Sequence, residues 1–110
     1  MTIRQPFFLT SAIPYVNSDP HLGHALELVQ SDAIARYQRA QGYDLRFTSG
    51  TDDNSLKNVR AAELAGTTPA ELVARYGAGF RRLAETLHVV HDDFIHTASD
   101  ARHAPAVHAL

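Results

Sequence analysis

The first fifty residues contain a short apolar run, a long amphipathic segment and a second short run, and this order restricts the fold more than any other feature. Residues 7–13 (FFLTSAI) are mostly apolar without strict alternation, which is typical of a strand buried on both faces of a parallel sheet. Residues 14–20 include two prolines and several polar side chains, so we expect a loop there. Residues 43–48 form the second predicted strand. A strand, a long helix and a strand make a βαβ unit, whose two strands run parallel.

The segment between these strands predicts a helix from about residue 22 to residue 41. Apolar residues recur at helical spacing, with polar residues between them. Gly42 follows where a C-terminal cap belongs. The expected apolar face consists of Leu22, Ala25, Leu26, Val29, Ala33, Ile34 and Tyr37. The side chains expected to face water are Glu27, Gln30, Arg36 and Arg39.

The rest of the chain continues this alternation of elements. The expected elements are a polar turn at 49–53, helices over 54–65 and 68–87, a strand over 93–97, and a last helix capped by Ser99. The second of these helices begins with a capping box at residues 68–71 (TPAE). The sequence therefore predicts an α/β fold, the first half of a Rossmann-like, doubly wound parallel sheet, with residues 1–110 forming one domain.

Composition narrows the class of protein. The chain has 110 residues and is 45% hydrophobic, which is enough for one modest core. It has no cysteine, which excludes disulfides and thiolate metal sites and fits a reducing cytosol. Its net charge of −2, and the absence of any basic run longer than Arg81-Arg82, give no sign of a nucleic-acid-binding surface. No segment approaches the ~20 apolar residues of a membrane helix. We expect a soluble, cytoplasmic domain.

The most specific motif is the string PHLGH at residues 20–24. Three interpretations of its two histidines stay open: ordinary surface or core residues, metal ligands with Asp52 as a third, or a phosphate site. A zinc site would normally show a spacing signal that this chain lacks. Histidines three apart in the first turn of a helix share one face, beside free backbone N–H groups. Because Gly23 has no side chain and a strand ends just before, a nucleotide phosphate is the favoured ligand.

These five residues resemble the HIGH signature of class I aminoacyl-tRNA synthetases. Neighbouring strings make the chain similar to the methionyl-tRNA synthetases, and the resemblance runs from Phe7 to Leu110. The strings are TSAIPYVN at 10–17, ARYQR at 35–39, GYD at 42–44, GTD at 50–52, DDF at 92–94 and RH at 102–103. The combination is much more specific than the HIGH-type motif alone.

The resemblance implies an ATP-dependent activation of methionine to methionyl-adenylate, followed by transfer to tRNA. By this resemblance His21 and His24 are catalytic residues that stabilise the charge developing on the ATP phosphates. His21, Gly23 and His24 together bind ATP, which arrives with Mg²⁺, and Gly23 lies against the adenine or ribose.

The methionine site is likewise implied by the resemblance. Ile13 and Tyr15 line the methionine side-chain pocket, and Asp52 holds the α-ammonium group. An apolar wall beside an aromatic face suits a thioether, and a carboxylate suits an ammonium. Relatives often carry Glu-His-Gly where this chain has residues 53–55 (DNS), so the roles of 54 and 55 stay open. Lys57 is assigned no function.

Other parts of the family are expected to lie outside this chain. The string Lys-Met-Ser-Lys-Ser does not occur, nor do the inserted domain that often binds zinc or the helical domain that reads tRNA. No metal ligand is assigned here. We therefore expect the N-terminal half of a catalytic domain, with exposed apolar surface that favours self-association or pairing with the other half. Two alternatives remain: another His-x-Gly-His nucleotidyl transferase, and a truncated, non-catalytic synthetase paralogue that acts as a binding module.

Overall fold

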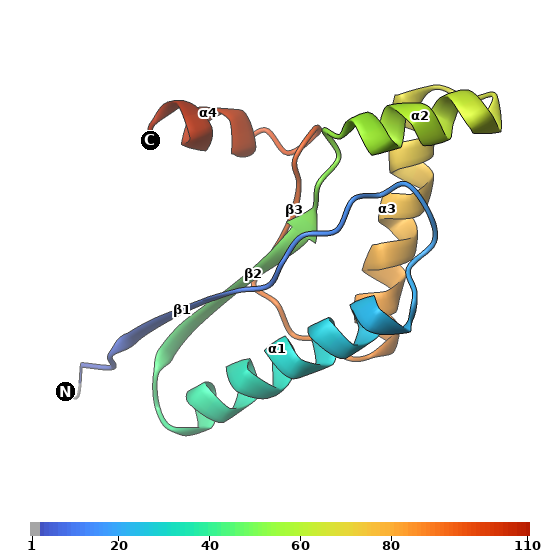
Figure 1. The fold of residues 1–110 in the computed structure, drawn as a ribbon. Coiled ribbons are helices and arrows are strands. Elements are labelled where there is room, and N and C mark those ends of the chain that lie inside the picture. Colours follow the sequence, from blue (N-terminus) through green and yellow to red (C-terminus); the bar gives the residue numbers. More distant parts are fainter. Residues whose placement is uncertain (1–2) are drawn as a thin grey trace.

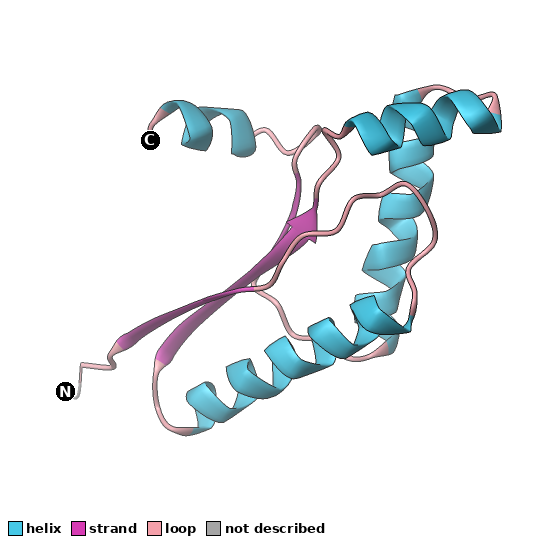
Figure 2. Ribbon diagram, viewed as in Figure 1, coloured by secondary structure: helices cyan, strands magenta, loops and turns pink. Residues whose placement is uncertain are grey.

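A computed structural model describes residues 3–110, and Figure 1 shows its α/β fold. Three parallel strands form one sheet in the order β1–β2–β3, with helices as the crossovers (Figure 2). The elements are β1 (Pro6–Thr10), α1 (Leu22–Ala40), β2 (Asp44–Thr51), α2 (Leu56–Ala65), α3 (Pro69–Thr86), β3 (Asp93–His96) and α4 (His103–His108). The predicted fold class and the parallel βαβ unit are confirmed.

The central strand β2 pairs with its two neighbours along different halves of its length. The β1 register runs from Pro6 opposite Asp44 to Thr10 opposite Thr48. The β3 register begins at Thr48 opposite Asp93 and ends at Thr51. The carboxyl end of β2 therefore extends past the end of β1, and the loop after β1 lies beside it (Figure 1).

Apolar side chains of β2 meet α1 and α3 in a single core on one face of the sheet. Phe47 is its largest fully buried side chain. The buried cluster consists of Leu28, Ala35, Leu45, Phe47, Ala84 and Val89, with Phe7, Leu9, Leu83 and Leu87 packed against it. On the other face, Phe8 of β1 is 68% exposed. The prediction that the first strand is buried on both faces is therefore wrong for this chain.

Two predicted strand boundaries are also wrong. β1 ends at Thr10 instead of residue 13, and β2 continues to Thr51 through part of the predicted polar turn at 49–53. The reason is pairing with β3, which places Ser49 opposite Phe94 and Gly50 opposite Ile95. Strand pairing satisfies the backbone of these small residues and overrides their local preference for a turn.

The orientation of α1 differs most from the prediction. Its buried residues are Leu28, Ser31, Asp32 and Ala35, on the side opposite the predicted apolar face. The residues Leu22, Leu26, Val29, Ala33 and Tyr37, here called the outer stripe, are exposed. Polar contacts account for this orientation, because the buried Asp32 carboxylate accepts a hydrogen bond from the Val90 N–H at 2.8 Å. The inward face of α1 thus contains a carboxylate that apolar periodicity alone does not reveal.

Two arginines expected to face water also join α1 to the segment before β3: Arg36 is exposed as expected, and Arg39 is half-buried. Arg36 pairs with Asp32 and donates to the His88 carbonyl at 2.7 Å. Arg39 donates to the Val90 carbonyl at 3.1 Å and to the Asp92 carboxylate at 2.9 Å. These contacts hold the 88–92 segment across the inner part of α1.

The helix ends largely match the predicted signals. Gly42 follows the last turn of α1 with φ +91, a conformation that suits glycine. The predicted capping box is confirmed, since Thr68 and Glu71 exchange hydrogen bonds at the start of α3. Ser99 does not cap the last helix, because α4 begins at His103 after Arg102, which makes no side-chain cap. No helix among residues 3–110 combines the length and apolarity needed to cross a membrane.

Gly50 on β2 lies opposite Ile95 on β3, and a Cβ added there would collide with the Ile95 carbonyl oxygen. We expect Gly50→Ala to lower the free energy of unfolding by about 2 kcal/mol through this overpacking. Gly79→Ala is the matched control, because a Cβ in that helix would lie 3.4 Å from Pro20 and 3.9 Å from Asp19, both ordinary van der Waals distances. Chemical denaturation measures both variants, and equal losses would contradict the close approach of the two strands.

Candidate functional site

Tyr15 and Asp52 lie side by side just beyond the carboxyl ends of β1 and β2. The Asp52 N–H donates to the Pro14 carbonyl at 2.8 Å, and Tyr15 forms an isolated parallel bridge with Asp52. The loop after β1 therefore runs beside the end of β2 as a further piece of strand pairing. Ile13 and Tyr15 are 42% and 43% exposed, so both side chains are accessible from solvent. The structure thus brings Tyr15 and Asp52 together as neighbours.

His21 and His24 cap the first turn of α1 reciprocally. His21 is the N-cap, and its Nδ1 accepts the Gly23 N–H at 3.1 Å. The Nδ1 of His24 accepts the His21 N–H at 3.1 Å. The two rings stack with their centroids 3.8 Å apart. A backbone N–H can only donate, so each Nδ1 lacks a proton and each neutral ring has its proton on Nε2.

This cap changes how the helix terminus can bind an anion. The prediction of free backbone N–H groups is wrong at Gly23, whose N–H is already bonded to His21. The space beside Gly23 is also occupied, since an added Cβ would lie 2.9 Å from Cε1 of the His21 ring. The donors that this cap leaves for an anion include the two Nε2–H groups.

The environment of His24 favours its neutral form. Burial lowers the pKa of His24 below its ordinary value of 6.5, and the charge of His21 lowers it further. The carboxylate of Glu27 acts in the opposite direction and is the weaker influence. Phe80 lies edge-on to the His24 ring, with centroids 4.9 Å apart. A neutral ring keeps its Nδ1 available for the cap.

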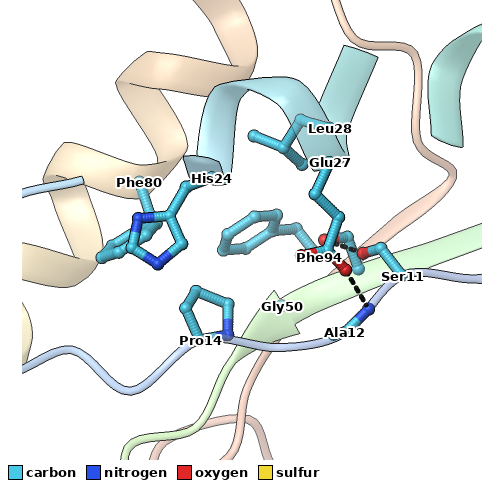
Figure 3. Close-up of a pocket in the computed structure, with 10 residues that line it drawn as sticks. Ser11, Ala12, Pro14, His24, Glu27, Leu28, Gly50, Phe80 and Phe94 are labelled. Atoms are coloured by element: carbon cyan, nitrogen blue, oxygen red, sulfur yellow. Dashed lines mark hydrogen bonds between the residues drawn. The ribbon is translucent and has the colours of Figure 1, made fainter. Parts of the chain in front are cut away.

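A hollow next to His24 lies between α1, α3 and the sheet (Figure 3). Its space for water-sized molecules is only about 20 Å³, room for roughly one water. It is lined by Ser11, Ala12, Pro14, His24, Glu27, Leu28, Ser49, Gly50, Phe80 and Phe94. Of the predicted site residues, only His24 lines it.

Two side chains that the sequence reasoning did not assign contact this region. Glu27 was expected to face water, but its carboxylate accepts the Ala12 N–H at 3.0 Å and so joins α1 to the loop after β1 (Figure 3). Lys57 places its Nζ 5.0 Å from the centre of the Tyr15 ring, a cation–π contact. The position of Glu27 one turn after His24 is the only sequence signal that pointed to it.

Asn54 and Ser55, whose roles the sequence left open, have local structural contacts. The Asn54 N–H donates to the Asp52 carboxylate at 3.3 Å. Ser55 is the N-cap of α2, and its hydroxyl accepts the Lys57 N–H at 3.1 Å. Within residues 3–110, no three His, Cys, Asp or Glu side chains are grouped so that they could hold a metal ion.

The lowered pKa of His24 predicts loss of stability in acid. The folded chain binds fewer protons at His24 than the unfolded chain, so this contribution is present above about pH 6.5 and is lost as the pH falls below it. In His24→Asn the amide oxygen replaces Nδ1 as cap acceptor but does not titrate. We expect the variant to lose less free energy of unfolding than the wild type between about pH 7.5 and about pH 5.5.

The pKa of His91 is also lowered by burial, but His91 is present in the wild type and in His24→Asn, so its contribution to the loss of stability is the same in both. Substitution of the exposed His108 by Asn is the control and should leave the wild-type loss unchanged. An equal loss in wild type and His24→Asn, by denaturant titration at the two pH values, would contradict the assignment.

The chain is similar in sequence to known proteins. Methionine–tRNA ligase of Brucella suis biovar 1 is 45% identical over 107 residues, 97% of this chain and 21% of the relative. Methionine–tRNA ligase of Mycobacterium leprae is 47% identical over 102 residues, 93% of this chain and 19% of the relative. This chain therefore spans about a fifth of the length of these relatives.

Solved structures agree. Mycobacterium tuberculosis methionyl-tRNA synthetase in complex with methionyl-adenylate superposes with a TM-score of 0.89 at 45% identity, covering 93% of this chain and 20% of that one. A LeuRS of Agrobacterium radiobacter K84, in a ternary complex with tRNA and LeuAMS, superposes with a TM-score of 0.83 at 26% identity. The match covers 89% of this chain and 13% of the LeuRS chain. The family model described as tRNA synthetases class I (M) matches residues 7–110. The chain, with its histidine-capped helix at the end of a parallel strand, belongs to this family of class I tRNA synthetases.

Proposed function

We propose that this chain is the N-terminal half of the catalytic domain of a methionine–tRNA ligase, over residues 1–110. Its part of the reaction is to bind ATP and methionine for the formation of methionyl-adenylate. Transfer to tRNA would use regions outside this chain. The observation that carries the proposal is the reciprocal histidine cap, which leaves two Nε2–H groups available as donors, with His24 near the end of the sheet where α/β folds bind ligands.

ATP would meet this cap through its phosphates. His21 and His24 each offer one Nε2–H to the negative charge that develops as the α-phosphate is attacked, and preorganised donors of this kind stabilise a transition state effectively. The Nδ1 bonds hold both rings in place beforehand. An adenine or ribose approaching Gly23 would first meet the His21 ring that covers it. Mg²⁺ would accompany the phosphates, and we assign it no residue of this chain.

Methionine would lie beside the paired segment of Tyr15 and Asp52. The Asp52 carboxylate is half-buried and is suited to a charge-assisted hydrogen bond from the α-ammonium group. Ile13 and Tyr15 offer an apolar and an aromatic surface to the thioether. The Lys57 ammonium over the Tyr15 ring helps to hold that ring. A cytoplasmic location agrees with the lack of cysteine.

The decisive assay is methionine-dependent ATP–pyrophosphate exchange by the chain and by a His21→Asn/His24→Asn double variant. Asparagine keeps the two cap acceptors near Nδ1 but removes both Nε2–H donors. We expect exchange to fall by at least about a hundredfold, the effect of losing one such donor, while the melting temperature stays close to that of the wild type.

His88→Asn is the matched control, because His88 has φ 54, a conformation that asparagine also tolerates, and lies away from the site. It should retain wild-type exchange. Exchange that persists in the double variant would contradict the role of the histidines. Binding of ATP and methionine without exchange would favour a binding module over an enzyme.

We also infer that the chain self-associates through the outer stripe of α1. Leu22, Leu26 and Tyr37 are 85%, 58% and 62% exposed on one helix face, and exposed apolar patches favour association. Leu26→Glu should reduce the molar mass measured by light scattering at high concentration, whereas Leu64→Glu, at a 92% exposed leucine on α2, should not. A wild type that stays monomeric at every concentration would contradict this inference.

A further inference from the structure

A hydrogen-bond chain behind Asp52 ends on the neighbouring carboxylate. Asp53 is 7% exposed. Its Oδ1 accepts from the Thr51 hydroxyl at 2.8 Å, and its Oδ2 accepts from the Ala98 N–H at 3.1 Å. The Asp53 N–H donates to the Thr97 hydroxyl at 2.8 Å. A buried carboxylate is costly unless it is hydrogen-bonded in this way, so the contacts form a fixed arrangement.

The chain of hydrogen bonds begins at the surface with Arg81. A guanidinium can only donate, so His96 Nε2 must accept from Arg81 at 3.0 Å. The neutral His96 ring then has its proton on Nδ1 and donates to the Thr51 hydroxyl at 2.9 Å. Thr51 in turn donates to Asp53. Every donor therefore points the same way, from an exposed cation to a buried anion.

The surroundings of His96 fit this role. A Cβ at Gly77 would lie 3.3 Å from Cε1 of His96, so glycine in α3 leaves room for the ring against β3. The Arg81 guanidinium also lies 5.5 Å from the centre of the Phe94 ring. Thr51 is fully buried, so no water competes for its hydroxyl.

A buried asparagine beside Asp53 holds the backbone of Asp52. The side-chain amide of Asn58, which is 1% exposed, donates to the carbonyls of Asp52 at 3.1 Å and Asp53 at 2.9 Å. On the other side, the Asp52 N–H reaches the Pro14 carbonyl. Asp52 therefore lies between a buried unit anchored on Asp53 and the loop that contains Tyr15.

We propose that Asp53 is a positioning residue for Asp52, and that the relay Arg81–His96–Thr51 holds Asp53 in place. In this arrangement Asp53 does not touch substrate. It sets the position at which Asp52 meets the ammonium group of methionine, and the link to methionine rests on the proposed function. Removing the carboxylate would leave the Thr51 hydroxyl or the Ala98 N–H without its acceptor.

Imidazole ¹⁵N NMR of this chain tests the relay directly. The wild type should show His96 protonated on Nδ1, and Thr51→Ser, which keeps the hydroxyl, should show the same. In Asp53→Asn the amide oxygen can accept the Ala98 N–H, so the amide nitrogen must donate to the Thr51 hydroxyl. Thr51 then donates to His96, and the direction of every hydrogen bond from Thr51 outward is reversed. His96 should then change to the Nε2–H form and lose its contact with Arg81.

Hydrogen exchange of the Asp52 N–H tests the positioning. We expect exchange about tenfold faster in Asp53→Asn and Thr51→Val than in wild type and Thr51→Ser, the effect of one lost buried hydrogen bond. In the ATP–pyrophosphate exchange assay, Asp53→Asn should raise the KM for methionine and leave the KM for ATP unchanged. Wild-type His96 protonated on Nε2, or unchanged protection of Asp52 in a folded Asp53→Asn, would overturn the proposal.

If Asp53→Asn does not fold, the same ¹⁵N measurement on Arg81→Met tests the relay, because Arg81 is exposed and its substitution should not prevent folding. Without Arg81 the Thr51 hydroxyl still donates to Asp53 and must still accept from Nδ1–H of His96, so the single Nδ1–H form should persist. Conversion of His96 to the Nε2–H form, or to a mixture of both neutral forms, would overturn the relay. A wild type that shows the Nδ1–H form and a protected Asp52 N–H, yet binds no methionine, would contradict the proposed function and leave the relay intact.

Discussion

The pairing of β2 with two neighbours of different register is the constraint on which the rest of the structure depends. β1 covers the first half of β2 and β3 covers the second, so the carboxyl end of β2 has a strand on one side only. The loop after β1 fills the other side through the pairing of Tyr15 with Asp52. This staggered arrangement brings Tyr15 beside Asp52, next to the buried Asp53 on which the relay ends.

Polar contacts, more than apolar periodicity, decide how the helices lie on this sheet. The buried Asp32 turns α1 toward the segment before β3, and Asp92 accepts the Phe47 N–H at 2.7 Å in the same region. Such bonds are strongly directional and leave an unpaired buried group if the helix rotates. The apolar outer stripe is consequently free to meet another surface. The hydropathy of α1 therefore reveals the apolar outer stripe, but it does not reveal which face of the helix enters the core.

The histidine pair combines a structural and a chemical function in the same atoms. Each ring uses Nδ1 to cap the helix, and this bond determines that Nε2 carries the proton. The cost of ordering the two side chains is thereby met in folding, before any ligand arrives. The same logic holds at His96, where an arginine and a threonine determine the opposite tautomer. In both places the hydrogen-bond partner of one nitrogen defines what the other can do.

The order of the elements, the parallel βαβ unit, the capping box and the family can be predicted from the sequence, because they depend on local pattern and on short motifs. Tertiary structure alone decided the inward face of α1, the extension of β2 through Gly50, the contact of Glu27 with the loop and the relay to Asp53. The physical reason is that these features rest on hydrogen bonds between segments far apart in the chain. Local sequence encodes which groups need a partner, and only the folded topology decides which partner they meet.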